Sequence, residues 1–471
     1  MLERRIAYLF PVFPVFHQTF VLWEVLGLRR NGIYPKIYSL RRAGGRQQPE
    51  AAEVAPEVAY LPSLFSLAPW RANWRLFRRG RRRYLRLYAA LVNSWRTGAV
   101  DLPAPDATQR QRVTLYNRLR GWFNSQPHLY LLKSFLLVPT AVYLAEQLRV
   151  EGITHLHAQW ASYPGTVAYL VHHISGLPFS ISAHAYDIYM VPRMLPAKLK
   201  AARFVVTCAK TNATFLQRLC GSEVKGKILI SYHGVDVNRF APPATNTDGS
   251  KRLQIISCGQ LERYKGMHLL IDACAVLERQ GVRFECLIIG NGPQRGQLER
   301  QIARLGLAAN VRLLGARPHA EVAELYRHAD IFVLASELAG KSGRRDVIAN
   351  VIVEAMAAGL PAVVSQIPGV EELVEDGVTG YLVPPNRSEG FAVAMKKLAD
   401  RPDDRVRFGK AARSRVLRDL DNTKNVRLLA QLLAAAAGVE QSAAELEEQT
   451  SALVADTDTF CRREAGQVNG P

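Results

Sequence analysis

Short apolar runs alternate along this chain with longer segments in which apolar residues recur at helical spacing. Such runs between turn signals predict buried strands, and the periodic segments between them predict helices. Strands separated by helices form βαβ units, which build parallel sheets. In the first half, strands are expected at residues 6–10, 36–39, 155–159, 179–183, 204–208 and 228–231. In the second half, strands are expected at 254–258, 284–289, 311–314, 331–334, 362–365 and 381–383, with helices such as 267–279 and 294–305 between them.

The chain of 471 residues is too long for a single hydrophobic core, so two domains are expected. The segment 241–250, rich in Pro, Thr, Asn and Gly, divides the two strand series and is typical of a linker. The fold class is therefore α/β, with two Rossmann-like domains. Ligands of such sheets bind at the carboxyl ends of strands, so we expect both domains to face a cleft that holds the site.

The domain boundaries follow from the same pattern. The prediction is a first domain at 1–240 with a basic insertion at about 60–130, a linker at 241–250 and a second domain at 251–400. Residues 401–437 are expected to form C-terminal helices that pack back on the first domain, and the polar, acidic-leaning residues 438–471 are expected to be a disordered tail.

Cysteine usage and hydropathy bear on the compartment. Six cysteines are scattered without C-x-x-C spacing, and five stand in apolar contexts, so a reducing compartment without disulfides or a zinc site is expected. The apolar run at 6–16 is interrupted by two prolines and has no small-residue cleavage site, which favours a first strand over a signal peptide. No uninterrupted apolar stretch approaches ~20 residues, so we do not expect the chain to span a membrane.

Charge is distributed unevenly. Residues 1–240 hold 32 Lys and Arg against 12 Asp and Glu, while the remainder holds 29 of each, so the whole net charge of +20 lies in the first half. Residues 65–125 alone contain 13 Arg and 2 Asp, interleaved with Trp and Tyr. This mixture suits an anionic membrane surface. Nucleic acid could use it too, but no nucleic-acid motif accompanies it, and a solvated basic face is the simpler alternative.

The segment 346–360 carries the most specific chemical pattern. Asp346 and Glu354 stand eight residues apart, and Glu354 is expected to open a small-residue helix that ends at Gly359. A helical separation of that length is roughly 12 Å, too far for one shared proton or metal. The two carboxylates could instead grip one extended ligand at two places. The alternative is a buried amphipathic helix with two solvated acids.

This segment resembles the E-x7-E signature of retaining glycosyltransferases of family GT4, which have the GT-B fold; here Asp346 replaces the first Glu. Relatives often have R-D-G-I-P-N-V-x-x-E-A-M-A at this place. The chain departs from that pattern at Val347 and Ala349, where Gly and Pro are usual. It keeps Arg345, Asp346, Asn350, Val351, Glu354, Ala355, Met356 and Ala357.

The stretch 256–266 offers an anion site. Gly259 ends a predicted strand, and Lys265 precedes a predicted helix whose N-terminal N–H groups favour anions, so Lys265 is well placed for a diphosphate leaving group. The stretch resembles the family's G-R-L-x-x-x-K-G, with Gln260 where Arg is usual; Arg263 could supply the missing charge. The alternative for Lys265 is an ordinary exposed lysine in a first helical turn.

Two further matches follow predicted strands. Gly290 and Gly292 lie in a turn that resembles the family's G-x-G-P loop, although tight loop geometry explains such glycines equally well. His184 lies just after the strand at 179–183, in a stretch that resembles T-A-H-A-x-D-I; a structural histidine is the alternative. Residues 9–20, 155–158 and 232–236 also resemble family segments, in family order.

The resemblance implies transfer of a sugar from a nucleotide-sugar donor to a hydroxyl of a saccharide or polyprenyl-linked acceptor, with retained configuration, in exopolysaccharide assembly. It implies that Lys265 stabilises the leaving diphosphate, that Asp346 binds donor-sugar hydroxyls, that Glu354 binds the ribose and that His184 lies beside the sugar. The other implied donor-binding residues are Gly259, Gln260, Arg263, Gly290, Gly292, Asn350 and Val351. No metal and no cofactor are expected. The expected location is cytoplasmic, peripheral on the inner face of the membrane.

Two other classes remain open. A sugar-nucleotide epimerase has the same two-domain outline and would release free sugar and nucleotide diphosphate without an acceptor. A non-catalytic protein of this fold that binds anionic lipid or glycan is the third interpretation, and the departures at Gln260, Val347 and Ala349 motivate it.

Overall fold

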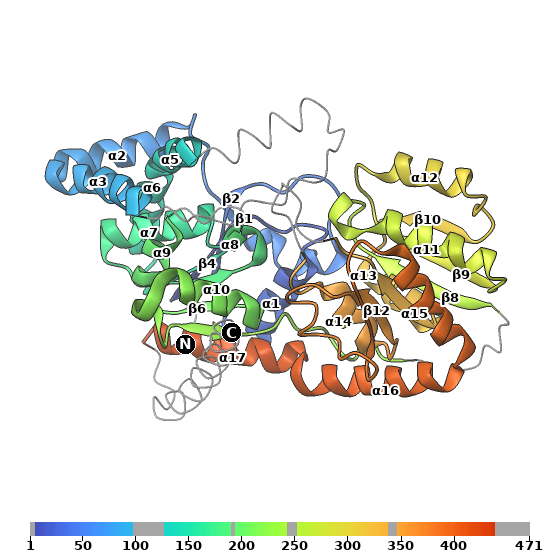
Figure 1. The fold of residues 1–471 in the computed structure, drawn as a ribbon. Helices are drawn as coiled ribbons and strands as arrows, with labels where there is room; N and C mark the ends of the chain where they lie inside the picture. The colour runs from blue at the N-terminus through green and yellow to red at the C-terminus, as the bar shows by residue number, and fades with distance from the viewer. Residues whose placement is uncertain (1–4, 98–126, 190–193, 243–251, 338–345, 439–471) are drawn as a thin grey trace, which may run out of the picture. The chain divides into compact units, whose positions relative to one another are not determined.

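The structure is a computed structural model, and it describes residues 5–97, 127–189, 194–242, 252–337 and 346–438 (Figure 1). The chain forms two compact units. Unit 1 consists of Met1–Ser231, Lys341–Gly343 and Val426–Pro471, and unit 2 of Tyr232–Gly340 and Arg344–Asn425. Each unit contains a parallel sheet covered by helices, as the alternating sequence pattern predicts.

The sheet of unit 1 has the order β3-β2-β1-β4-β5-β6-β7. Its strands are β1 (Ile6–Val12), β2 (Lys36–Arg41), β3 (Ala59–Tyr60), β4 (His155–Gln159), β5 (Phe179–Ala183), β6 (Val205–Thr207) and β7 (Ile228–Ile230). Its helices are α1 (Thr19–Arg30), α2 (Leu67–Arg79), α3 (Arg81–Thr97), α5 (Pro127–Leu136), α6 (Val138–Val150), α7 (Tyr163–Ser175), α8 (Ala185–Tyr189), α9 (Leu195–Ala201), α10 (Lys210–Cys220) and α17 (Asn422–Ala436), with 3-10 helices η1 (Pro49–Glu53), η2 (Ala55–Glu57) and η3 (Gly221–Val224).

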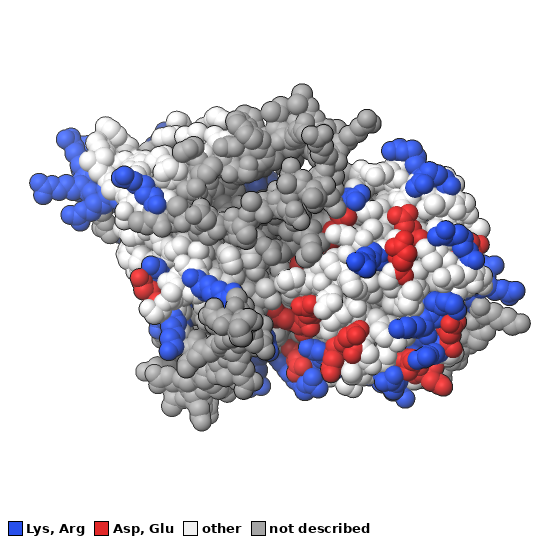
Figure 2. Space-filling view, in the orientation of Figure 1, with Lys and Arg blue, Asp and Glu red and all other residues white. Residues whose placement is uncertain are grey.

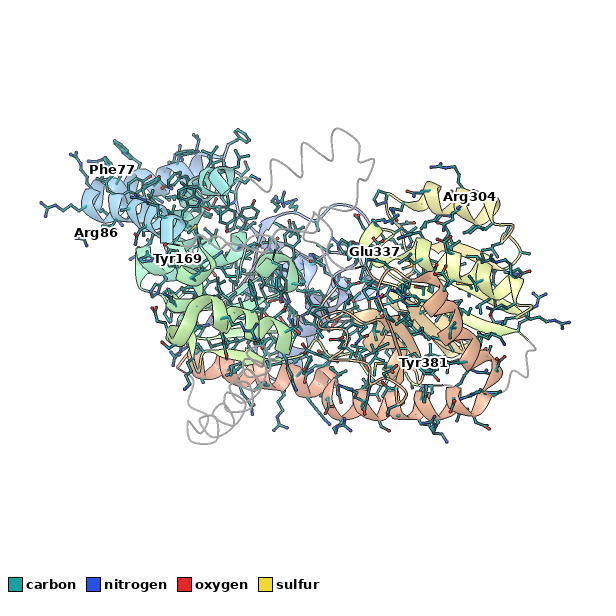
Figure 3. The ribbon with its side chains drawn as sticks, viewed as in Figure 1. Phe77, Arg86, Tyr169, Arg304, Glu337 and Tyr381 are labelled. Carbon is teal, nitrogen blue, oxygen red and sulfur yellow. The ribbon has the colours of Figure 1, made fainter. Side chains whose placement is uncertain are left out.

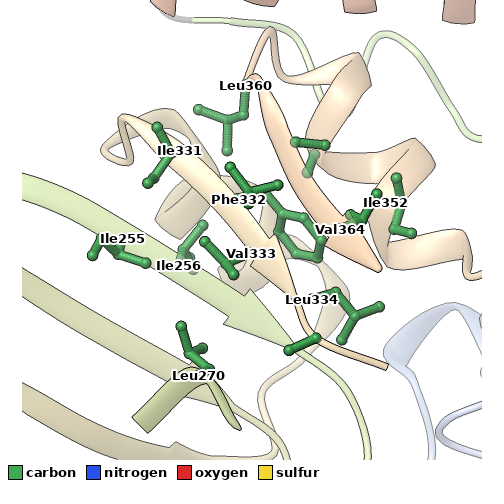
Figure 4. Close-up of a cluster of buried hydrophobic side chains, with 14 of the residues drawn as sticks. Ile255, Ile256, Leu270, Ile331, Phe332, Val333, Leu334, Ile352, Leu360 and Val364 are labelled. Carbon is green, nitrogen blue, oxygen red and sulfur yellow. The ribbon is translucent and has the colours of Figure 1, made fainter. Parts of the chain in front are cut away.

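The sheet of unit 2 has the order β10-β9-β8-β11-β12-β13. Its strands are β8 (Leu253–Cys258), β9 (Phe284–Ile289), β10 (Val311–Gly315), β11 (Ile331–Leu334), β12 (Ala362–Ser365) and β13 (Gly380–Val383). Its helices are η4 (Arg263–Lys265), α11 (Met267–Arg279), α12 (Arg295–Arg304), α13 (His319–Arg327), α14 (Asn350–Ala357), α15 (Ser388–Asp400) and α16 (Pro402–Asp419). Branched apolar side chains of adjacent strands, such as Ile255, Val333 and Val364, fill its core (Figure 4).

All twelve predicted strands form, with ends that differ from the prediction by two residues at most. The first strand confirms that the apolar N-terminal run belongs to the folded protein. Two predictions about individual strands and helices need correction. The short edge strand β3 was missed, and Glu354 does not open a helix: α14 begins at Asn350, so Glu354 lies in its second turn. Most of the expected linker and the expected tail lie outside the described residues.

The last two described helices belong to different units. Helix α16 packs on α14 and α15 in unit 2, whereas α17 supplies Val426, Leu429 and Leu433 to the core of unit 1. The prediction that the helices of residues 401–437 pack back on the first domain is therefore wrong for α16 and holds only for α17. Val426 lies against Gly27 of α1 so closely that a Cβ atom at Gly27 would come within 2.9 Å of the Val426 side chain. The absence of a side chain at Gly27 is therefore what allows α17 to dock.

A fully buried strand in unit 1 is polar rather than apolar. His155 and His157 of β4 lie on one face of the sheet and meet the serines of β5: Ser180 Oγ lies 2.8 Å from His155 Nε2 and 2.7 Å from His157 Nδ1, and Ser182 Oγ lies 2.9 Å from His157 Nε2. Burial lowers the pKa of His155 to about 3, with Arg203 as a second cause, and lowers that of His157 well below its usual value. Both histidines are therefore neutral structural groups.

The basic insertion forms helices as far as it is described; residues 98–126 lie outside the described part. Ser66 caps the start of α2 and Gly80 separates α2 from α3. Helix α2 packs on α6, and α3 packs on α2, α5 and α7. By length and composition, the helical segment Leu129–Val150, which covers most of α5 and all of α6, could cross a membrane, which the sequence did not lead us to expect. Half of its most apolar window is buried inside the protein.

Candidate functional site

The strand order of unit 2 reverses between β8 and β11. Ligands of doubly wound sheets bind beyond the carboxyl ends of the strands at such a point. Here β8 leads into Gly259, and β11 leads into Ala335, Ser336 and Glu337. The predicted residues of the second domain therefore have to be located around these two loops.

Glycines bring the loops of this edge into close contact. Gly266 has φ +65°, and a Cβ atom there would lie 1.7 Å from Ala335 O, so only glycine lets η4 approach the loop after β11. Gly290 has φ +145°, and its Cβ would lie 1.8 Å from Gly259 O. In both loops, tight packing accounts for the glycine. Gly292 packs in the same way against Leu261 O.

Lys265 and Asp346 form an ion pair with an Nζ–Oδ1 distance of 2.6 Å. The other carboxylate oxygen of Asp346 accepts a hydrogen bond of 2.5 Å from Ser336 Oγ. Burial opposes the charge of Lys265, but the carboxylate of Asp346 outweighs it and raises the pKa of Lys265 above its ordinary value. Only 12% of the Lys265 side chain is exposed, so a charged ammonium group is held at the switch point in a place largely shielded from water.

Glu354 is held by a residue that the sequence pattern did not single out. Its Oε1 lies 2.9 Å from Nε2 of His319, the first residue of α13, and both side chains are buried. The charges of Glu354 and Lys265 both act on the thiol of Cys258 at the end of β8, where burial is the main cause that raises the thiol pKa to about 12. The charges of Glu354 and Lys265 are therefore both close to the end of β8.

Arg263 belongs to a second cluster at the same edge. Its Nε donates to Glu337 Oε2 at 3.1 Å, and His268 Nε2 lies 3.3 Å from Glu337 Oε1. Burial alone would raise the pKa of Glu337, but the hydrogen bond from His268 and the charge of Arg263 lower it overall. Figure 3 labels Glu337 in this part of unit 2. Gln260 stands where the family pattern has an arginine, and Arg263 follows it by three residues at the same edge of the sheet.

The remaining predicted donor residues have mainly backbone roles. The carbonyl oxygen of Gln260 accepts from Glu262 N at 2.7 Å, and its side chain is half-buried. The carbonyl oxygen of Val351 accepts from Tyr326 OH at 3.4 Å. The Asn350 side chain hydrogen-bonds to His233, whose pKa burial lowers to about 4.

His184 follows β5 in unit 1. Its ring lies between Phe20 and Trp160, with centroid distances of 5.5 and 5.3 Å, and its Nε2 lies 3.2 Å from Gln159 Nε2. Its backbone N–H donates to Asp187 Oδ1 at 2.8 Å. A candidate sugar contact is thus fixed through both its ring and its backbone. His184 lies in unit 1 and the other candidates lie in unit 2, so their meeting in one site stays a prediction.

A buried cluster supports the loop after β4. Asp187 belongs to the stretch that resembles T-A-H-A-x-D-I, but no sequence pattern pointed to its neighbour Lys198. Asp187 also accepts a hydrogen bond from Ala161 N, while Lys198, which is 0% exposed, donates to Ala161 O and to Tyr130 OH. Burial lowers the pKa of Lys198 to about 7 and raises that of Asp187 to about 7. Both backbone polar groups of Ala161, in the loop after β4, are therefore held: its N–H by Asp187 and its carbonyl oxygen by Lys198.

The site residues of unit 2 that the motifs did not single out are polar and lie next to strand ends, which is the signal that could have found them. Ser336 and Glu337 follow β11 directly, and His319 begins the helix after β10. Strand ends beside a switch point carry ligand sites, so polar residues there deserve the same weight as a motif.

Comparison with known proteins gives matches mainly in the second half. Residues 242–415 match the family model "Glycosyl transferases group 1". Over 210 residues the chain is 36% identical to the putative colanic acid biosynthesis glycosyltransferase WcaL of Escherichia coli, which covers 44% of this chain and 51% of that protein. It is 36% identical over 181 residues to the amylovoran biosynthesis glycosyltransferase AmsK of Erwinia amylovora, covering 38% and 44%. The chain thus spans about half the length of the curated relatives it matches.

Solved structures share the fold along nearly the whole chain. HepE of Anabaena, in complex with UDP, has a TM-score of 0.63 at 17% identity and covers 92% of this chain and 100% of its own. Sucrose-phosphate synthase of Thermosynechococcus elongatus has a TM-score of 0.65 at 17% identity and covers 93% and 100%. These likenesses confirm the predicted α/β fold of two Rossmann-like domains, the GT-B class. That the domains face a cleft stays a prediction.

Proposed function

Because residues 242–415 form a glycosyl transferases group 1 domain within a two-domain fold, we propose that this protein is a glycosyltransferase of exopolysaccharide assembly. It takes a sugar from a nucleotide-sugar donor and transfers it, with retained configuration, to a hydroxyl of a saccharide acceptor. The observation that carries this proposal is the largely buried Lys265–Asp346 ion pair at the switch point of the matched domain. The biosynthetic names of WcaL and AmsK and the UDP bound to HepE support it.

The most demanding part of the proposed reaction is the departure of the diphosphate leaving group. The bond between the anomeric carbon and the diphosphate oxygen breaks, and the acceptor oxygen bonds to that carbon on the same face. The departing diphosphate oxygen takes the acceptor's proton, so no protein nucleophile is needed. Negative charge grows on the diphosphate, and a fixed cation stabilises the transition state there. Lys265 is suited to this role because its pKa is raised, and the N-terminus of α11 begins two residues later.

The ion pair gives Asp346 two tasks in this proposal. It holds the ammonium group of Lys265 in place, with Ser336 fixing the carboxylate, and it accepts hydrogen bonds from donor-sugar hydroxyls. Glu354, fixed by His319, accepts from the ribose, and His184 contacts the sugar. The glycine loops and Arg263 surround the diphosphate. No metal is required by this arrangement, since Lys265 and Arg263 supply the positive charge.

The relatives' biosynthetic names support the choice of an acceptor class. We assign a saccharide carried on a polyprenyl lipid, a hexose as the transferred sugar, and a place on the cytoplasmic face of the membrane, where such a lipid would present its saccharide.

The test uses the full chain. Thermal unfolding is measured with UDP, GDP and ADP, and a ligand that binds only the folded protein at ~100 times its dissociation constant adds about 2.7 kcal/mol. Sugar transfer to a lipid extract is then followed with the nucleotide-sugar of the base that stabilises. Free sugar and nucleotide diphosphate without any acceptor would identify an epimerase, and stabilisation by none of the three nucleotides would overturn the proposal.

A further inference from the structure

The exposed side of helix α2 departs from ordinary amphipathic design. Its buried residues are small or polar, Pro69, Ala72 and Asn73, and Asn73 Nδ2 anchors it by donating to Pro139 O of α6 at 3.2 Å. The large apolar side chains point outward instead. The exposed residues recur at spacings of three and four and form one stripe, named here the outward stripe of α2: Leu67, Trp70, Arg71, Trp74, Arg75 and Arg78.

The apolar members of this stripe are unusually open to solvent. Trp70 is 52% and Trp74 61% exposed, Leu67 is 65% exposed, and Phe65 just before the helix is 99% exposed. The indole N–H of Trp70 donates to Leu64 O at 2.7 Å. Its polar group is therefore already satisfied, and the ring can enter an apolar medium without losing a hydrogen bond.

Positive charge surrounds these rings, and the segment that carries them contains no acid of its own. Residues 65–97 contain nine arginines and no Asp or Glu. Arg75 pairs with Glu146 of α6 and so braces the helix, and Arg81 lies over the ring of Phe77. Among the described residues, no ion pair engages Arg71, Arg78, Arg79, Arg82 or Arg86.

The charge gathers at one place on the surface. Figure 2 shows Lys and Arg clustered over α2 and α3, whereas basic and acidic groups are mixed over unit 2. Phe77 and Arg86, labelled in Figure 3, belong to this hairpin of helices. Helix α3 continues the pattern with Arg82, Leu85 and Arg86 exposed.

We propose that the outward stripe of α2, with Phe65, Arg79 and the exposed arginines of α3, is a docking surface for an anionic lipid bilayer. Tryptophan and leucine enter the interface between headgroups and acyl chains, and unpaired arginines bind the headgroup phosphates. A solvated basic face would not need two tryptophans and a phenylalanine in the open. This surface lies outside the candidate catalytic residues, so it holds whether or not the proposed transfer reaction is the right one.

The first experiment is sedimentation of the full chain with phosphatidylcholine vesicles that contain or lack phosphatidylglycerol. Binding should require phosphatidylglycerol and fall as salt is raised, because salt screens exposed charges. Arg71→Ser/Arg78→Ser/Arg79→Ser should weaken binding on the order of 100-fold, since each arginine near an anionic surface contributes ~1 kcal/mol. The matched control removes three exposed arginines of unit 2, Arg283→Ser/Arg300→Ser/Arg304→Ser, and should bind like the wild type.

The second experiment tests the apolar part with the charge unchanged. Leu67→Ser/Trp74→Ser should lose at least ten-fold in vesicle binding, whereas Val393→Ser/Val406→Ser, which alters two exposed apolar residues of unit 2, should lose none. Thermal unfolding must match the wild type for all variants, and any stabilisation by nucleotide should be kept. Equal binding to neutral vesicles, equal loss in the control variants, or an unaffected Leu67→Ser/Trp74→Ser protein would each overturn the proposal. Binding to single-stranded RNA but not to acidic vesicles would overturn it as well.

Discussion

Two largely buried lysines, Lys198 in unit 1 and Lys265 in unit 2, each lie near an aspartate, and their pKa values shift in opposite directions although burial lowers both. The ammonium group of Lys265 contacts the carboxylate of Asp346 directly, and its pKa rises. The hydrogen bonds of Lys198 go to a carbonyl and a phenol oxygen, while Asp187 spends its oxygens on backbone N–H groups, and burial lowers the pKa of Lys198 to about 7.

The difference teaches that burial alone does not decide the role of a lysine; the atom that receives its hydrogen bond does. A lysine that keeps its charge beside a carboxylate can meet an anionic ligand by exchanging partners. A lysine whose donors are satisfied by neutral oxygens holds backbone in place. The contacts of Lys198 are those of an architectural residue, whereas the charge of Lys265 suits the binding and catalytic role proposed for it.

The largest effect is expected on breaking the cluster of unit 1. Lys198→Met should lower the free energy of unfolding by about 3–5 kcal/mol, because Asp187 is left buried without its cationic neighbour. Denaturant unfolding measures it, and Lys198→Met/Asp187→Asn should recover part of the loss. If Lys198→Met unfolds like the wild type, Lys198 has no architectural role and the comparison fails.

The corresponding changes in unit 2 should act on turnover. Lys265→Ala, Asp346→Ala and Glu354→Ala should each reduce sugar transfer by an order of magnitude or more, since a hydrogen bond to a charged group contributes roughly 1.5–3 kcal/mol. For Lys265→Ala the loss should lie in kcat more than in nucleotide affinity, because the leaving-group charge appears in the transition state. A folded variant with wild-type turnover would remove that residue from the site.

A pH titration extends the comparison to the histidines of unit 1. The folded-state pKa of His155, about 3, lies below its unfolded value near 6.5, so the unfolded chain binds more protons between these values. The stability due to neutral His155 is fully present above pH 6.5 and is lost as the pH falls toward 3, by about 1.4 kcal/mol per pH unit. Unfolding at several pH values should show a smaller slope in His155→Gln; an identical slope would contradict the assignment.

The smallest effect is expected for an exposed pair with the same chemistry. Lys396 Nζ lies 2.7 Å from Asp400 Oδ2, and both side chains are well exposed. Lys396→Ala should change stability by no more than about 0.5 kcal/mol, as is usual for helix pairs four residues apart. A loss of unfolding free energy as large as that of Lys198→Met would show that direct contact, and not burial, decides how much a lysine contributes to stability.

How far the sequence predicts this molecule depends on the range of the interaction. Strands such as β4 and β9 were located to the residue because hydrophobic period and turn chemistry are local. β3 was missed because its two half-buried residues carry no period. The candidate residues came from a family resemblance, and their roles stay predictions. The Lys265–Asp346 contact joins residues 81 positions apart, so no local pattern could reveal that the two side chains meet. Lys198 stands in a short segment typical of a surface helix, so no local pattern could reveal its burial.

The return of α17 to unit 1 has a consequence for the order in which the chain becomes a protein on the ribosome. Val426, Leu429, Leu433 and their neighbours up to Ala437 complete a core whose remaining members lie before Ser231, and unit 2 is synthesised between these two groups. The face of α1 around Gly27 therefore lacks its α17 partner until nearly two hundred residues after Ser231 have emerged. During that interval unit 2 can finish its own core while unit 1 cannot, so the domain that is translated first is the one that matures last.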